Sequence, residues 1–246
     1  AEGLVCDIGG SSMELAEVSN GQVGRAVTSP LGPLRLQSLP GGKKARKQHI
    51  ARIVDGLARD FGGGSLPLYL VGGSWRAIAR IDMERRRYPL RVLHEYRMSR
   101  KSVAATLDWI AEHDLESLRQ MTGIGEARLA LVPLACEVLA ALMRALKPRE
   151  IAVSSYGIRE GLLYEQMPQA LRVRDPLIEA CAFAEHKDAR LPGFGKSLYK
   201  FILPLFEKAP DERKRLLRAA CHLHDVTWRA HPDYRHEACF DNVTRA

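Results

Sequence analysis

The chain is organised around the stretch 4–18, which reads Leu4-Val5-Cys6-Asp7-Ile8-Gly9-Gly10-Ser11-Ser12-Met13-Glu14-Leu15-Ala16-Glu17-Val18. Its apolar run stops at a Gly-Gly-Ser-Ser segment and then resumes, which predicts two paired strands joined by a tight turn. Glycines there allow a positive φ or the close approach of a ligand. A turn of this composition presents backbone N–H groups and hydroxyls at one point, as a phosphate requires. The alternative is an ordinary glycine-serine hairpin with a solvated aspartate, because short glycine motifs occur widely.

Two carboxylates flank this turn, Asp7 at the end of the first strand and Glu14 just beyond the turn. Carboxylates beside a phosphate commonly hold Mg²⁺ or position a water. We therefore expect both to be catalytic and metal-binding, with Mg²⁺ or another divalent cation as cofactor. The phosphate-binding residues of the turn are expected to be Gly9, Gly10, Ser11 and Ser12.

A second glycine turn follows a predicted buried strand over residues 66–71. It leads into a helix predicted from Ser74 to Ile81, with Ser74 near the N-cap. Unpaired N–H groups at a helix N-terminus attract anions. Gly72, Gly73 and Ser74 are therefore candidate phosphate-binding residues, although the glycines could equally serve only to permit a tight turn.

The remaining pattern predicts an α/β lobe over residues 1–167. A third strand (22–28) extends the hairpin, and a helix reaches about Phe61. Residues 81–100 suggest a basic connection. A long apolar helix (126–146), which we expect to be almost wholly buried, precedes a strand (151–154) and a helix (158–166). This order is that of one ribonuclease H-like lobe of the actin and sugar-kinase type, in which ligands lie at strand ends between two lobes.

Five blocks stand in an order and spacing typical of one family. They are Asp7-Ile8-Gly9-Gly10-Ser11-Ser12-Met13-Glu14-Leu15, Pro30-Leu31-Gly32-Pro33-Leu34-Arg35-Leu36, Val71-Gly72-Gly73-Ser74, Thr122-Gly123-Ile124 and Ser154-Ser155-Tyr156-Gly157-Ile158-Arg159-Glu160-Gly161. Together they resemble the exopolyphosphatase and guanosine pentaphosphate phosphohydrolase family (Ppx/GppA), from about Leu4 to Met167. Ser11 stands where that family usually has a third glycine, and Met13 where it usually has a hydroxyl. In the last block, Arg159 and Glu160 could form a structural ion pair or support the phosphate loop.

The resemblance implies metal-assisted attack of water on a terminal phosphoanhydride, releasing orthophosphate from inorganic polyphosphate or guanosine pentaphosphate. It also implies a preceding lobe that carries the first phosphate loop and the glutamate that activates water, since the chain enters a strand directly after Ala1-Glu2-Gly3. We therefore expect the 246 residues alone to be inactive and the full-length parent to be a homodimer. A non-catalytic phosphate-sensing or interaction module on the same lobe is the alternative, favoured by Ser11 and Met13.

The chain is basic, with 37 Lys and Arg residues against 29 Asp and Glu and a net charge of +8. This charge suits a polyanionic partner. A basic run at Lys43, Lys44, Arg46 and Lys47 could meet such a partner or could be a solvated turn. A nucleic-acid binder lacks support, because no aromatic-interleaved basic helix is evident. Five cysteines without a C-x-x-C pair and no long apolar run indicate a cytoplasmic protein that is not in a membrane.

Residues 168–246 have helical spacing over 171–185, 195–206 and 211–223, and no strand pattern. His222, His224 and Asp225 resemble part of the metal site of HD phosphohydrolases, which also needs an earlier histidine. His186 does not lie in a clear helical pattern. We therefore expect a degenerate, truncated, all-α HD-like domain without a transition metal.

Overall fold

The computed structural model describes residues 2–62 and 65–245, the side chain of residue 245 excepted. The chain divides into two compact units, residues 1–162 and 163–246. The division falls inside one helix, α8 (Ile158–Gln166). The first unit is a mixed α/β structure and the second is helical in its described residues, so each is presented by itself.

The predicted hairpin begins the sheet of the first unit and extends into a three-stranded meander. Strands β1 (Gly3–Ile8), β2 (Met13–Ser19) and β3 (Gln22–Ser29) pair in antiparallel order, as the sequence predicts. Alternate residues explain this pairing: Leu4, Cys6, Ile8, Met13 and Leu15 are buried. Asp7 and Glu14 lie on the opposite, half-buried face of the sheet.

Parallel strands complete the sheet on the other side of β1. Strand β4 (Leu68–Val71) lies parallel to β1, and β6 (Ile151–Ser154) lies parallel to β4. A short edge strand, β5 (Tyr96–Met98), pairs antiparallel with β6, so the order is β3-β2-β1-β4-β6-β5. The sequence predicted a connection at 81–100 and missed β5, because three residues carry too little alternation to identify a strand.

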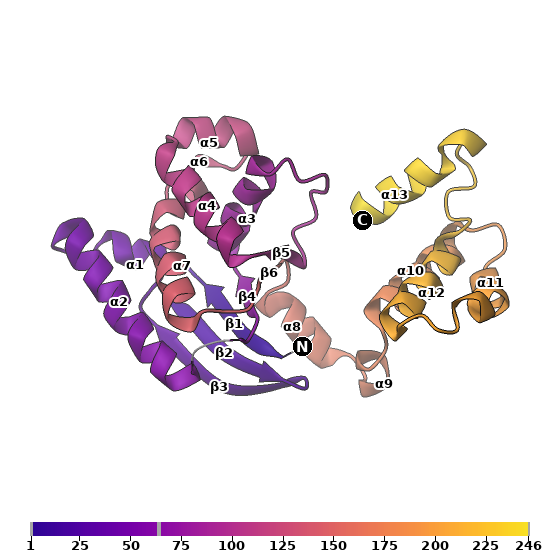
Figure 1. Cartoon of the computed structure of the whole chain (residues 1–246), viewed down its shortest axis with the longest axis horizontal. Helices are drawn as coiled ribbons and strands as arrows, with labels where there is room; N and C mark the ends of the chain where they lie inside the picture. The colour runs from indigo at the N-terminus through magenta and orange to yellow at the C-terminus, as the bar shows by residue number, and fades with distance from the viewer. Residues whose placement is uncertain (1, 63–64, 246) are drawn as a thin grey trace. The chain divides into compact units, whose positions relative to one another are not determined.

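In the first unit, helices connect β3 to β4, β4 to β5 and β5 to β6 (Figure 1). Their bounds are α1 (Pro33–Gln37), α2 (Gly42–Phe61), α3 (Gly73–Arg85), α4 (Arg100–Glu112), α5 (Leu115–Thr122), α6 (Glu126–Leu129) and α7 (Val132–Leu146). Helix α7 contacts α2, α3 and α4, and its apolar side chains join the core that the sheet residues form. The predicted helix from Ser74 to Ile81 exists, but it begins one residue earlier and extends to Arg85.

The long apolar segment Glu126–Leu146 differs from the single buried helix that the sequence predicts. It is two helices, with α6 ending before Ala130 and α7 starting after Leu131, where Pro133 occupies the first turn. By length and composition alone the segment could cross a membrane, contrary to the sequence-based expectation of no such run. More than half of its most apolar window is buried inside the protein, however, as in a core helix. The other face of α7 is open, since Glu137 and Arg144 border a cavity.

A buried carboxylate ties three elements of the first unit together. Asp82 of α3 is completely buried and accepts hydrogen bonds from Thr106 (2.5 Å), Tyr96 (2.6 Å), Ser102 (2.8 Å) and Arg85 (2.9 Å). These donors come from α3, β5 and α4. Burial raises the pKa of Asp82, but the four donors outweigh it and the pKa lies below its usual value.

The second unit contains α9 (Gln169–Arg172), α10 (Pro176–Asp188), α11 (Phe194–Ile202), α12 (Asp211–Leu223) and α13 (Arg235–Arg245), with short 3₁₀ turns at Leu203–Phe206 and Pro232–Tyr234. Residues 171–185 form two helices rather than the predicted one, because Asp175 caps α10 and Pro176 starts it. His186 lies in the last turn of α10, so the expectation that it lies outside a clear helix is wrong. A small core of Ile178, Cys181 and Ala219 joins α10 to α12.

Candidate active site at the carboxyl edge of the sheet

The two predicted catalytic carboxylates face each other across the first hairpin. Asp7 of β1 is the direct cross-strand partner of Glu14 of β2. Side chains of directly opposed residues lie on the same face of a sheet and within contact range. Burial raises the pKa of Asp7, the facing Glu14 raises it further, and Arg76 opposes both. The pair therefore concentrates negative charge at one point of the sheet.

The turn between them is held mainly by its own backbone. The Gly9 N–H donates to the Ser12 carbonyl (3.0 Å), and the Ser12 hydroxyl donates to Glu14 (2.7 Å). The Gly9 N–H is therefore engaged, whereas the N–H groups of Gly10 and Ser11 have no acceptor within the described residues. Neither Gly9 nor Gly10 adopts a positive φ, so the conformational reason that the sequence suggested for this glycine pair does not apply.

The glycine that this turn requires is Gly32, twenty residues away. A Cβ at Gly32 would lie 2.3–2.5 Å from backbone atoms of Ser11, Ser12 and Gly10. In the same contact, the Leu34 N–H at the start of α1 donates to the Gly10 carbonyl (2.8 Å). The second sequence block thus supports the turn from behind.

The second glycine turn lies directly beside the first. Val71 of β4 is the parallel partner of Asp7, and Gly72 follows it. Gly72 has a φ of 116°, and a Cβ there would lie 2.5 Å from the Ile8 carbonyl oxygen and 3.2 Å from the Asp7 carboxylate. Only glycine fits this close approach without strain. The two predicted phosphate loops therefore meet at one edge of the sheet.

The N-terminus of α3 opens at this edge without a side-chain cap. Its N-cap is Gly72, so the prediction that Ser74 lies near the N-cap is shifted by two residues and Ser74 lies within the first turn. Uncapped N–H groups at the start of a helix favour a bound anion. Gly72, Gly73 and Ser74 are all in place to contact one.

A third turn, between β6 and α8, completes the edge. Ser154 is the parallel partner of Val71, so the three strand ends form a row. Glu160 accepts a hydrogen bond from the Gly157 N–H (2.7 Å), which holds the pKa of that carboxyl below its usual value. Glu160 thus fixes the start of its own helix, and the neighbouring Arg159 is exposed in the first turn.

Two guanidinium groups at this edge were not predicted. Arg76 donates to the Gly72 carbonyl (3.3 Å) and to the Ser155 carbonyl (3.1 Å), joining the second and third turns. The Arg128 guanidinium of α6 lies over Gly73, since a Cβ built there would be 3.4 Å from its Nε. Arg76 follows the Gly-Gly-Ser block by two residues and could have been noticed in the sequence. Arg128 could not, because only the tertiary structure brings it here.

Residues 1–170, more than half of the chain, match the sequence model of the Ppx/GppA phosphatase family. The chain belongs to this family. Ppx/GppA structures also share its fold. The Ppx/GppA phosphatase of Aquifex aeolicus, in its type II variant, aligns with a TM-score of 0.57 at 17% identity, over 68% of this chain and 57% of its own. An exopolyphosphatase from Cytophaga hutchinsonii aligns with a TM-score of 0.57 at 18% identity, over 66% and 56%.

The chain therefore spans less than three fifths of the length of these Ppx/GppA structures. A further neighbour, described as an exopolyphosphatase-like protein, aligns at 21% identity with a TM-score of 0.53, over 66% of this chain and 58% of its own. No curated protein matches the sequence. At these identities the structural neighbours show the fold alone.

The two departures from the usual Ppx/GppA loop are accommodated without strain. Ser11 is exposed and does not adopt a positive φ, so this position accepts a side chain. Met13 is completely buried in the core, so it removes no group from the exposed part of the loop. Neither residue distorts the turn between Asp7 and Glu14.

The residues of this edge fit the Mg²⁺ that the family resemblance implies. Among residues 2–62 and 65–245, no group of three or more His, Cys, Asp or Glu side chains gathers as a complete metal site. Mg²⁺ is commonly held by only one or two carboxylates, together with waters and substrate phosphates. Asp7 and Glu14 supply two such carboxylates. Burial is the largest cause of the raised pKa of Asp7, and the second cause, repulsion from Glu14, is the one that a cation would relieve.

The histidine cluster of the second unit makes contacts within the protein, although the buried His222 Nε2 has no partner among the described residues. His222 Nδ1 lies 2.6 Å from Glu185, which also accepts a hydrogen bond from the Gly195 N–H (2.6 Å). Asp225 binds Arg190 at 2.7 Å, and the His224 ring packs against Phe194. These contacts stabilise the packing of α10, α11 and α12.

Proposed function

We propose that this chain supplies one wall of the active site of a phosphoanhydride hydrolase. The proposed reaction releases terminal orthophosphate from inorganic polyphosphate, as an exopolyphosphatase does, or from guanosine pentaphosphate. The observation that carries the proposal is the Asp7–Glu14 pair at the point where two glycine turns and the Arg76 guanidinium meet. A carboxylate with a perturbed pKa, as Asp7 has, beside anion-binding backbone is typical of a catalytic site.

Each part of the edge has a role in this reaction. The free N–H groups of Gly10 and Ser11 and the N-terminus of α3 bind phosphoryl oxygens, and Arg76 and Arg128 neutralise their charge. Mg²⁺, when bound by Asp7 and Glu14, polarises a phosphoryl oxygen as a Lewis acid. The two carboxylates also orient the attacking water. The water oxygen bonds to the terminal phosphorus as the bridging P–O bond breaks, and the electron pair stays on the bridging oxygen. One proton of the water passes to the glutamate that the opposing lobe would supply, and orthophosphate and the shortened polyphosphate or nucleotide are the products.

The sheet order supports a ribonuclease H-like lobe of the actin and sugar-kinase type. β1, β4 and β6 are parallel and end at a common edge, and a β1–β2–β3 meander lies on one side. We propose that residues 1–167 form the second lobe of such an enzyme and that the opposing wall comes from another lobe. A helical HD-like domain from residue 168, a cytoplasmic location and a homodimeric parent belong to the same proposal.

A non-catalytic phosphate-binding module is the second candidate. The Ser12 hydroxyl favours it, because it donates to Glu14 and so occupies one oxygen of the carboxylate that a metal or water would need, while the N–H groups of Gly10 and Ser11 stay free for phosphate. Such a module would bind phosphate at residues 9–12 without turnover.

Orthophosphate release by the full-length parent separates the two candidates. The assay uses Mg²⁺ with long-chain polyphosphate and, separately, guanosine pentaphosphate, for the wild type, Asp7→Asn and Glu14→Gln. Glu17→Gln is the matched control, because Glu17 lies on the same strand, β2, away from the turn. Turnover that both site variants lose and the control keeps supports the hydrolase. Phosphate binding without turnover in the wild type supports the module.

The 246-residue chain itself is expected to release no orthophosphate from either substrate, because a phosphoryl group in this architecture is held from two lobes. Correct positioning of the reactants can lower the barrier by about 7–11 kcal/mol. If the 246 residues retain a substantial part of the rate of the parent, and Asp7→Asn abolishes it, the complete machinery lies within this chain.

A further inference from the structure

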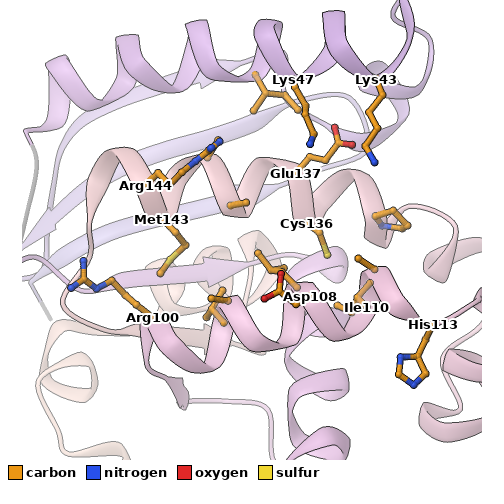
Figure 2. Close-up of a pocket in the computed structure, with 18 of the residues that line it drawn as sticks. Lys43, Lys47, Arg100, Asp108, Ile110, His113, Cys136, Glu137, Met143 and Arg144 are labelled. Atoms are coloured by element: carbon orange, nitrogen blue, oxygen red, sulfur yellow. The ribbon is translucent and has the colours of Figure 1, made fainter.

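A cavity of about 930 Å³ opens between helices α2, α4 and α7 of the first unit (Figure 2). This volume is at the upper end of the range for small-molecule sites. We call it the α2/α4/α7 cavity. None of its lining residues belongs to the candidate active site, so the phosphatase proposal leaves it unexplained.

The border of the α2/α4/α7 cavity carries cations that lack partners. Lys43 and Lys47 of α2, Arg100 of α4 and Arg144 of α7 are exposed, and none forms an ion pair within the part of the chain that the structure describes. Figure 2 shows Lys43 and Lys47 side by side on one helix, as expected for residues four positions apart. These four cations give the opening of the cavity its positive charge.

The carboxylates around the cavity do not balance these cations. Glu137 accepts hydrogen bonds from two of the three guanidinium nitrogens of Arg46, Nε at 2.8 Å and Nη2 at 2.9 Å. Asp114 caps α5 by accepting the Ser117 N–H at 2.8 Å. Asp108 is the remaining carboxylate in the lining, so an excess of positive charge faces the cavity.

The start of α2 adds to this excess. Its first turn contains no acidic residue, and its N-cap, Gly41, supplies no side-chain hydrogen bond. A helix N-terminus favours negative charge, whereas here it carries Lys43 and Lys44. A bound anion beside Lys43 and Lys47 would complement both the lysines and the helix.

The interior of the cavity is aliphatic. Ile50, Val103, Ile110 and Ala141 are buried, and Leu107, Cys136 and Met143 are partly buried. His113 provides the single aromatic ring of the lining, and that ring already packs against Trp109 at 4.0 Å. A nucleobase would therefore find no free aromatic ring to stack on, whereas an aliphatic chain would find apolar walls.

We propose that the α2/α4/α7 cavity binds an amphipathic anion with an aliphatic chain. The chain lies along the apolar floor between α4 and α7, and the phosphate or carboxylate head binds Lys43 and Lys47. Part of the basic run at 43–47, which the sequence left open as either a polyanion contact or a solvated turn, is thus a head-group site. Arg46 is excluded from it, because it binds Glu137.

Isothermal titration calorimetry of the 246-residue chain with monomeric dodecyl phosphate tests this proposal. Inorganic phosphate and AMP are the comparison ligands, and neither is expected to bind within about tenfold of the affinity for dodecyl phosphate, a difference of about 1.4 kcal/mol. Equal affinity for AMP or for inorganic phosphate, lost when Lys43 and Lys47 are both replaced by Glu, would overturn the aliphatic assignment, because binding at the candidate active site would survive that replacement. Binding to phosphatidylglycerol vesicles but not to the monomer would instead indicate a membrane surface and would also overturn it.

Variants locate the binding site. Lys43→Glu combined with Lys47→Glu is expected to weaken dodecyl phosphate binding by about tenfold or more, and Lys44→Glu by less than about twofold. Lys44 is the matched control because it lies on the same turn but does not line the cavity. Ala104→Phe, at an exposed position in the lining, should block the chain site while circular dichroism shows that the fold is kept. Equal losses in the Lys44 control, or none in Ala104→Phe, would contradict the proposal.

Discussion

Asp7 and Asp82 are aspartates of the same unit, but their surroundings shift their pKa values in opposite directions. Asp82 is completely buried, yet four donors hold its pKa below the usual value. Asp7 is only partly buried, yet burial and the facing Glu14 raise its pKa. The protein has thus satisfied the carboxylate that it buries most deeply and left the one at the sheet edge beside a second negative charge.

This difference separates a structural carboxylate from a candidate catalytic one. Glu185 in the second unit resembles Asp82: burial raises its pKa, but His222 and the Gly195 N–H outweigh burial and lower it. A carboxylate whose partners all come from the fold has no need of a ligand. Asp7 faces the negative charge of Glu14, and the charge of Arg76 is the one cause that lowers its pKa. A bound cation or a proton on Asp7 would relieve the repulsion from Glu14.

The largest expected difference between Asp7 and Asp82 is in catalytic activity. In the full-length parent proposed above, Asp7→Asn and Glu14→Gln are each expected to lower kcat by about 10²–10³, the cost typical of losing one group that stabilises a transition state. KM should change little, because such a group acts mainly in the transition state. Asp82→Asn should retain the kcat of the fraction that remains folded. Orthophosphate release measures all three, and equal losses of kcat at Asp7 and Asp82 would remove the distinction.

For the free energy of unfolding, replacing Asp82 is expected to have the larger effect and replacing Asp7 the smaller. Asp82→Ala leaves the buried Tyr96 hydroxyl without an acceptor and removes one hydrogen bond each from Thr106, Ser102 and Arg85, so we expect the free energy of unfolding to fall by about 3 kcal/mol. Asp7→Asn should leave it unchanged or raise it, because the variant removes a repulsion. Urea unfolding followed by circular dichroism measures both. Asp55→Ala on α2, an exposed position, is the control and should change little.

Acid should act on the two aspartates in opposite senses. The lowered pKa of Asp82 contributes stability that is present above the unfolded value, about 3.9, and is lost as the pH falls through the folded pKa. The raised pKa of Asp7 contributes stability that is present below about 3.9 and is lost as the pH rises through its folded pKa. Between pH 4 and 7, the advantage of Asp7→Asn over the wild type should therefore grow with pH. Urea unfolding at a series of pH values tests this slope, and an advantage that shrinks with pH would contradict it.

The smallest expected effect concerns metals in the second unit. Glu185 and Asp225 are already paired, and His222 uses its Nδ1 on Glu185, although its buried Nε2 has no partner among the described residues. We expect no stoichiometric Mn, Fe or Zn at these residues. Elemental analysis of protein purified without chelator provides the measurement, and His224→Ala is the variant to compare. One transition metal per chain that this variant loses would show that the second unit holds a metal site.

Sequence patterns predicted those parts of the site that depend on local structure. Asp7, Glu14 and the turn between them follow from alternation and glycine spacing, which fix a hairpin without distant contacts. Gly72 was found for the same reason, although its contact with the Ile8 carbonyl became visible only in the structure. The assignment of catalytic, metal and phosphate roles to these residues stays a prediction.

Residues that act through tertiary contacts were missed. Arg128 reaches Gly73 from a helix more than fifty residues later, and Gly32 supports a loop that it does not belong to. The break at residues 130–131 was overlooked because apolar periodicity continues through it, and only Pro133 signals a new helix start. The network of Asp82 escaped notice because its donors come from three separate elements.

The position of β1 between β2 and β4 has a consequence for folding kinetics. Its pairing with β2 closes a short turn, whereas its pairing with β4 joins Leu4 to Leu68. Short loops close at the lower entropic cost, so the hairpin is expected to form first. Asp7 would then meet Glu14 before Gly72 and Arg76 arrive, and the folding transition state would contain the repulsion without the opposing guanidinium. Asp7→Asn is therefore expected to speed refolding, and stopped-flow fluorescence can measure the rate. An unchanged rate would indicate that β1 pairs with β2 and β4 at the same stage of folding.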